Sequence, residues 1–135
     1  MIPRWVWIVM MIGIGVEFAL GVACLVLVPV RRPDQWLPPQ SRGLYVAHAV
    51  LGGLLAIGAL TILVAVLGGS RFVRLGAQVG LVGLSLGAAG GMLSVSHPWR
   101  LTGMGLMFVG SIVAFFGYLI PLAESSVQER PSNDA

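Results

Sequence analysis

Residues 5–30 read WVWIVMMIGIGVEFALGVACLVLVPV, an apolar run that contains a single acidic residue, Glu17. Three more apolar runs of similar length follow, at Leu44–Leu67, Phe72–Val95 and Trp99–Ala123. A helix of about 20 apolar residues crosses a hydrocarbon core roughly 30 Å thick, and in lipid each run must pair its backbone groups internally. The sequence therefore predicts an all-α integral membrane protein, a four-transmembrane-helix up-down bundle.

The composition agrees with a membrane protein and excludes a soluble one. Of 135 residues, 57% are hydrophobic and 10% are charged, which is more apolar surface than a soluble domain of this size can bury. The spans occupy most of residues 1–123, which we interpret as one membrane domain with no room for a soluble catalytic domain. We therefore expect no enzymatic activity. The polar residues 124–135 are predicted to form a disordered tail.

The basic residues are all arginines, which gives a formal net charge of +3 without any lysine. This usage is typical of a GC-rich bacterial genome, so we expect a multi-pass protein of a bacterial cell membrane. The arginines are too few and scattered to bind nucleic acid, and they fit a role beside lipid head groups. Four spans place both termini on one side. The amino terminus and the short Arg71/Arg74 hairpin favour the cytoplasm, although arginines are equally numerous on both sides.

Small residues recur along one face of each predicted helix. In the third span five glycines are spaced alternately by four and three residues: Gly76, Gly80, Gly83, Gly87 and Gly90. Such spacing places them on one seam, where small residues let helices approach closely. The other spans carry similar stripes: Gly13, Glu17, Gly21 and Cys24; His48, Gly52, Ala56 and Ala59; Gly103, Met107, Gly110, Ala114 and Gly117. We interpret these stripes as packing seams of a compact bundle; alternatively, one of them faces a partner subunit.

Glu17 is the main candidate for function, because a charge near the bilayer midplane costs at least about 2.5 kcal/mol. Counting along the helices places Ser85 and Ser111 at the same depth, where either hydroxyl could bond the carboxyl group. One interpretation is a neutral carboxyl group that donates an interhelical hydrogen bond. The other is a proton- or cation-responsive acid in a transport or partner site.

Two histidines suggest a weaker hypothesis, a haem with two axial imidazoles or a quinone site near His48. His48 and His97 differ by about six residues in depth, roughly 9 Å along a helix, whereas opposed axial ligands need nearly equal depth. We therefore expect no cofactor; His48 then serves as a packing residue and His97 as a helix-stop residue. No metal site is expected either, because close ligand spacing is absent.

Several arginines collect on the side of the membrane opposite the termini. Arg31, Arg32 and Arg100 are candidates, with His97, for a ligand or lipid-phosphate site. The alternative is a solvated basic rim without a specific ligand.

Two functions follow from these features. The first is a non-catalytic accessory or scaffold subunit, which binds a membrane-protein partner or a second copy of itself within the bilayer. In size, span count and the acid of its first span, the chain also resembles in outline the small multidrug resistance transporters. That resemblance implies an oligomeric proton-coupled transporter in which Glu17 is the coupling acid. The long loop at residues 31–43 departs from the short loops of that family.

Overall fold

The four predicted spans are four helices in the computed structural model, which describes residues 2–27, 42–94 and 99–128. The chain forms, in order, α1 (Arg4–Leu27), α2 (Arg42–Ala65), α3 (Arg71–Ser94) and α4 (Arg100–Gln128). All four are long and apolar enough to cross a membrane, and the described residues contain no strand. The predicted four-helix membrane bundle is therefore confirmed.

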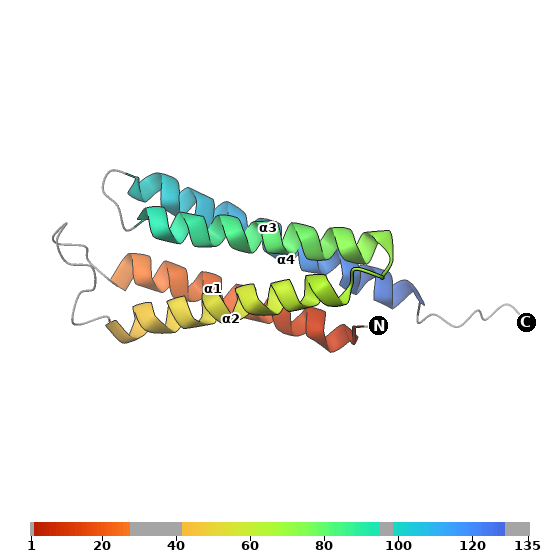
Figure 1. Cartoon of the computed structure of the whole chain (residues 1–135). Coiled ribbons are helices and arrows are strands. Elements are labelled where there is room, and N and C mark those ends of the chain that lie inside the picture. The colour runs from red at the N-terminus through yellow and green to blue at the C-terminus, as the bar shows by residue number, and fades with distance from the viewer. Residues whose placement is uncertain (1, 28–41, 95–98, 129–135) are drawn as a thin grey trace, which may run out of the picture.

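The helices run alternately up and down, so that the start of α1, the α2–α3 turn and the last residues of α4 lie at one end of the bundle (Figure 1). Helix α1 packs against α2 and α4, and α3 also packs against α2 and α4. The contact between α3 and α4 is by far the most extensive of these. The bundle thus consists of one close hairpin, α3–α4, and two helices that pack on it less closely.

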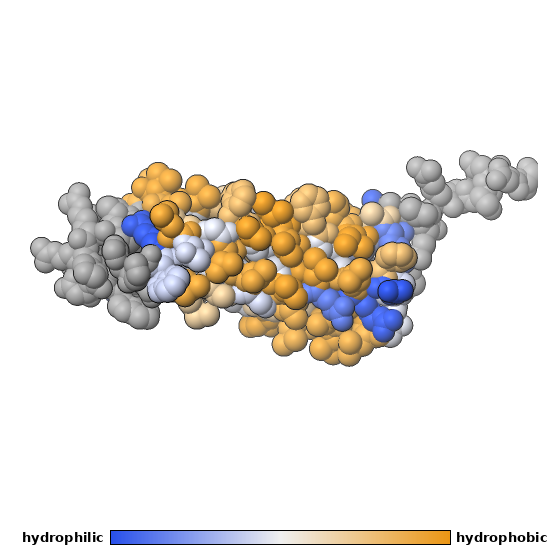
Figure 2. Space-filling model, turned by 90° about the horizontal axis from the view of Figure 1, so that it is seen from above, coloured by the Kyte–Doolittle hydropathy of each residue, from blue (hydrophilic) through white to orange (hydrophobic). Residues whose placement is uncertain are grey.

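The face of the bundle shown in Figure 2 is mostly apolar, with hydrophilic residues near its two ends. Many large apolar side chains are exposed along the helices, including Ile12, Ile57 and Phe116. In the apolar 18-residue window of each candidate span, only 17–28% of the residues are buried inside the protein. So much exposed apolar surface is unfavourable in water, and a bilayer accommodates it.

The α3–α4 contact depends on the absence of side chains. A Cβ atom at Gly76, Gly80 or Gly90 would lie closer than 3.0 Å to atoms of α4. At Gly83 it would overlap the backbone of Gly110 and Ala114.

Gly87 differs from the other four glycines of α3. A Cβ at this position would have no atom within 4 Å, although the Gly87 backbone itself lies against Gly110. A Cβ at Gly87 would therefore point into open space, unlike a Cβ at the other four glycines of the α3 stripe.

Aromatic packing fills the interior near the termini. Trp7 of α1 and Tyr118 of α4 are buried, with ring centroids 6.1 Å apart. The Tyr118 ring occupies the space that Gly80 leaves open, and Pro121 occupies the space at Gly76. Pro121 lies inside α4, where it cannot donate the usual backbone hydrogen bond. The α3 glycines thus accommodate two bulky residues of α4.

The α2–α3 turn is tied to the end of α4 through Ser70. The Ser70 hydroxyl accepts a hydrogen bond from the Val73 N–H, 3.2 Å away, and so caps α3. The same hydroxyl donates to Glu124 Oε2 over 3.0 Å. Glu124 was expected to begin a disordered tail, but α4 continues to Gln128. The rest of that predicted tail lies outside the described residues.

Candidate functional site: the Glu17–His48 pair

Glu17 lies on the face of α1 that packs against α2. Glycines stand one turn before and one turn after it: a Cβ at Gly13 would meet the end of Leu55, and one at Gly21 would meet the His48 ring. Small residues at these positions let α2 approach α1 on both sides of the carboxyl group. The predicted stripe of α1 is therefore in contact with α2 around Glu17.

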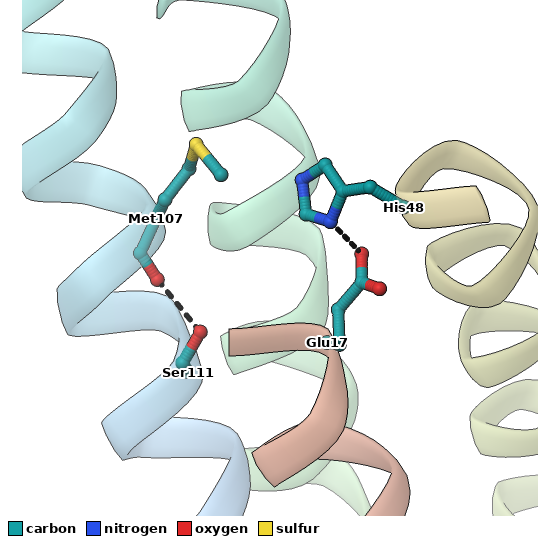
Figure 3. Close-up of polar contacts among 4 residues, drawn as sticks. All are labelled: Glu17, His48, Met107 and Ser111. Carbon is teal, nitrogen blue, oxygen red and sulfur yellow. Dashed lines mark hydrogen bonds and ion pairs between the residues drawn. The ribbon is translucent and has the colours of Figure 1, made fainter. Parts of the chain in front are cut away.

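The partner of Glu17 is His48 of α2 (Figure 3). Glu17 Oε1 lies 2.9 Å from His48 Nδ1, and each side chain is 17% exposed in the bare protein. The distance suits an ion pair when the imidazole is protonated and the carboxyl group is not. The pair therefore brings together two groups that can each gain or lose a proton.

Gly52 of α2 provides the space for the carboxyl group. It follows His48 by one turn, and a Cβ at Gly52 would lie 2.7 Å from Glu17 Oε1. Gly53, the next residue, is exposed, and a Cβ there would have no atom within 4 Å. The close approach is thus specific to Gly52, which positions the acid beside the histidine.

The pair leaves hydrogen-bonding capacity unused. Neither the buried Glu17 Oε2 nor His48 Nδ1 has an aligned hydrogen-bond partner among the described residues. We therefore describe the 2.9 Å contact as electrostatic. The surroundings are apolar: the Met107 methyl group lies beside Gly21, and the Phe18 and Phe108 rings pack with centroids 5.6 Å apart. Such a setting strengthens an interaction between charges.

Ser85 and Ser111, the two serines that could have bonded Glu17, each bond a carbonyl group of their own helix instead. Ser85 is exposed, and its hydroxyl donates to the Leu81 carbonyl over 2.9 Å. The Ser111 hydroxyl donates to the Met107 carbonyl over 2.9 Å, also within its own helix (Figure 3). Serine hydroxyls inside helices commonly bond the carbonyl four residues earlier.

Of the other residues predicted for a ligand or lipid site, Arg100 is the one that the structure describes, and it lies at the opposite end of the bundle from the start of α1. Arg100 is the first residue of α4 and is half-buried. His97, Arg31 and Arg32 lie outside the described residues, so the haem and lipid hypotheses that use them stay predictions. Within the described ranges, no group of three or more His, Cys, Asp or Glu side chains could hold a metal ion.

The contact between Glu17 and His48 is not among the predictions made from the sequence. The sequence does carry a signal for it, because each of the two residues stands on the small-residue stripe of its own helix. The relative depth of the two residues is harder to predict, since α2 begins two residues earlier than the expected Leu44.

Neither a family model, nor a curated protein, nor a solved structure matches this chain. The function is therefore argued from the geometry of the helices and of the pair.

Proposed function

We propose that this four-span membrane protein is a non-catalytic accessory or scaffold subunit of a larger membrane assembly. The observation that supports this role is a small-residue pair on the outside of α1. Gly15 and Ala19 lie one turn apart and are both exposed, and a Cβ at Gly15 would have no atom within 4 Å. Two small residues four positions apart on a lipid-facing helix allow another helix to approach closely.

The residues beside this pair also suit helix association. Ile12 and Val16 are 61% and 48% exposed, and both are β-branched. Their side chains have few rotamers in a helix, so they lose little conformational freedom when a second helix covers them. The glycines that face inward at Gly83 and Gly90 are already covered by α4 and cannot contact a partner.

The test is purification of tagged protein from its native host in mild detergent, followed by identification of co-purifying membrane proteins. A Gly15→Leu substitution fills the proposed contact. Gly105→Leu is the matched control, because Gly105 is also exposed and without neighbours. The residues one turn away from Gly105 are the large Leu101 and Val109.

We expect a stoichiometric membrane partner with the wild type and the control, and its loss with Gly15→Leu. Both substitutions should leave the thermal unfolding temperature nearly unchanged, because a Cβ at Gly15 or at Gly105 has no atom within 4 Å. Equal retention of the partner by both variants would contradict the proposed face. A pure homodimer without any partner would contradict the accessory role.

A second candidate function, proton-coupled transport by an oligomer, is supported by the Glu17–His48 contact. Paired acids and histidines within spans are typical of proton relays. The test is proton uptake into proteoliposomes under a potassium-valinomycin potential, followed with a trapped pH-sensitive dye. We expect Glu17→Gln to abolish uptake and Ser85→Ala, at an exposed serine, to preserve it. Uptake that survives Glu17→Gln would remove Glu17 from this role.

A further inference from the structure

A second polar feature lies at the end of the bundle that contains the α2–α3 turn. A surface pocket of about 350 Å³ opens there, lined by Leu67, Arg71, Arg74, Leu75 and Gln78. Hydrophilic residues also gather at this end beside the apolar surface (Figure 2). Arg100, the described arginine of the predicted lipid site, lies at the opposite end of the bundle and does not line this pocket.

The two arginines supply positive charge that the described residues do not neutralise. Arg71 and Arg74 lie one turn apart on α3, and both are exposed. Within residues 2–27, 42–94 and 99–128, neither forms an ion pair with a carboxylate. Glu124, the nearby acid at this end, is bound to the Ser70 hydroxyl instead. Arg74 Nη1 lies 3.5 Å from the Leu67 carbonyl oxygen, which holds that guanidinium at the rim of the pocket.

The pocket is amphipathic as well as basic. Leu67 and Leu75 form its apolar part, and Leu75 is itself 45% exposed. Gln78 adds a neutral polar side chain one turn further along α3 than Arg74. A ligand that suits all of these residues carries an anionic group with several acceptor oxygens and an apolar chain. Guanidinium groups bind phosphate oxygens in a planar, two-pronged geometry, which adds specificity to the charge attraction.

We propose that this pocket binds the head-group phosphate of an anionic phospholipid, with the acyl chain beside Leu67 and Leu75. Its position at the end of α2 and α3 is the level at which lipid phosphates lie relative to a span. A free phosphate ion would use the arginines and leave the two leucines without a role. The membrane lipid is therefore the source that accounts for the whole pocket.

The experiment measures binding of phosphatidylglycerol to the detergent-purified full chain by native mass spectrometry, with phosphatidylcholine as the uncharged comparison. The test variant is Arg71→Gln with Arg74→Gln. The matched control for a single charge is Arg42→Gln, which removes an exposed arginine at the other end of the bundle, outside the predicted lipid site of Arg31, Arg32 and Arg100. Arg71→Gln alone is the second test variant, because the Arg71 side chain makes no hydrogen bond within the described residues and its loss should not affect folding.

We expect phosphatidylglycerol affinity to fall at least about tenfold in the Arg71/Arg74 variant and by less than about twofold in the control. The Arg71→Gln variant should show a smaller fall, and excess inorganic phosphate should not displace the lipid. An affinity loss in Arg42→Gln equal to that in Arg71→Gln would overturn the proposal, since it would indicate a general charge effect. Displacement by inorganic phosphate would overturn it too, in favour of a free-anion site.

Discussion

Glu17 has two kinds of neighbour on α2, His48 beside its carboxyl group and Gly52 beneath it. An unpaired charge inside a membrane is costly, and a nearby opposite charge reduces that cost. The apolar surroundings make the pair sensitive to its spacing, because attraction between charges increases as they approach. Substitutions beside the pair should therefore act by moving the Glu17 carboxyl group relative to His48.

Gly52→Ala should displace the Glu17 carboxyl group from His48. The new methyl group would lie 2.7 Å from Oε1, so the flexible end of the acid must move. The measurement is the carboxyl stretching region of the infrared difference spectrum on titration, with Glu17→Gln to assign the band. Gly53→Ala is the matched control, because a Cβ there meets no atom. A Glu17 band that is the same in Gly52→Ala as in the wild type would contradict the contact.

Glu17→Gln and His48→Gln should not be additive in their effects on stability. Each removes one partner of a part-buried pair, so we expect each to lower the free energy of unfolding by about 1–3 kcal/mol. The double variant should lose less than the sum, with a coupling of at least about 0.5 kcal/mol. Reversible unfolding in mixed detergent measures all four proteins. Additive losses would show that the two side chains act independently.

The candidate site could be predicted only in part at this scale. Glu17 and His48 stand out because polar residues are rare in the spans. Their pairing depends on the axial offset of α1 and α2, and hydropathy does not determine such an offset to within one turn. Ser85 and Ser111 share the depth of Glu17 by counting, yet each satisfies its hydroxyl within its own helix.

Two glycines of the α3 stripe, Gly83 and Gly87, should differ in how an alanine substitution affects stability. Gly83→Ala places a methyl group on the backbone of α4, which cannot move aside as a flexible side chain can. We expect it to lower the free energy of unfolding by about 1–3 kcal/mol. Gly87→Ala should be neutral or stabilising by up to about 1 kcal/mol, since alanine favours helix more than glycine. Thermal unfolding in detergent measures both; equal losses would contradict the described seam.

The helices themselves could be predicted well, because apolar length and flanking polar residues define a span. The expected run Leu44–Leu67 is α2 at Arg42–Ala65, and Phe72–Val95 is α3 at Arg71–Ser94. The end of the fourth helix could not be predicted in the same way. Hydropathy marks the part of a helix that suits lipid, whereas α4 continues through polar residues as far as Gln128, the last residue that the structure describes.

Gly43 and Gly68 lie at opposite ends of α2, Gly68 in the turn that follows the helix. Both are exposed, and a Cβ at either position would have no atom within 4 Å. In a Cys24→Ala background, Gly43→Cys and Gly68→Cys should therefore react with a membrane-impermeant maleimide from opposite sides. Labelling of intact cells and of inverted vesicles measures this. Labelling of both cysteines from one side would contradict a membrane-spanning α2.

The unequal packing of the bundle has a consequence for its biogenesis. Helices α3 and α4 are synthesised after α1 and α2, and the most extensive helix contact among the described residues joins them. The first two spans therefore enter the bilayer before the surface on which they pack is complete. We expect α1 and α2 to pack loosely in the nascent chain until α4 leaves the ribosome and completes that surface.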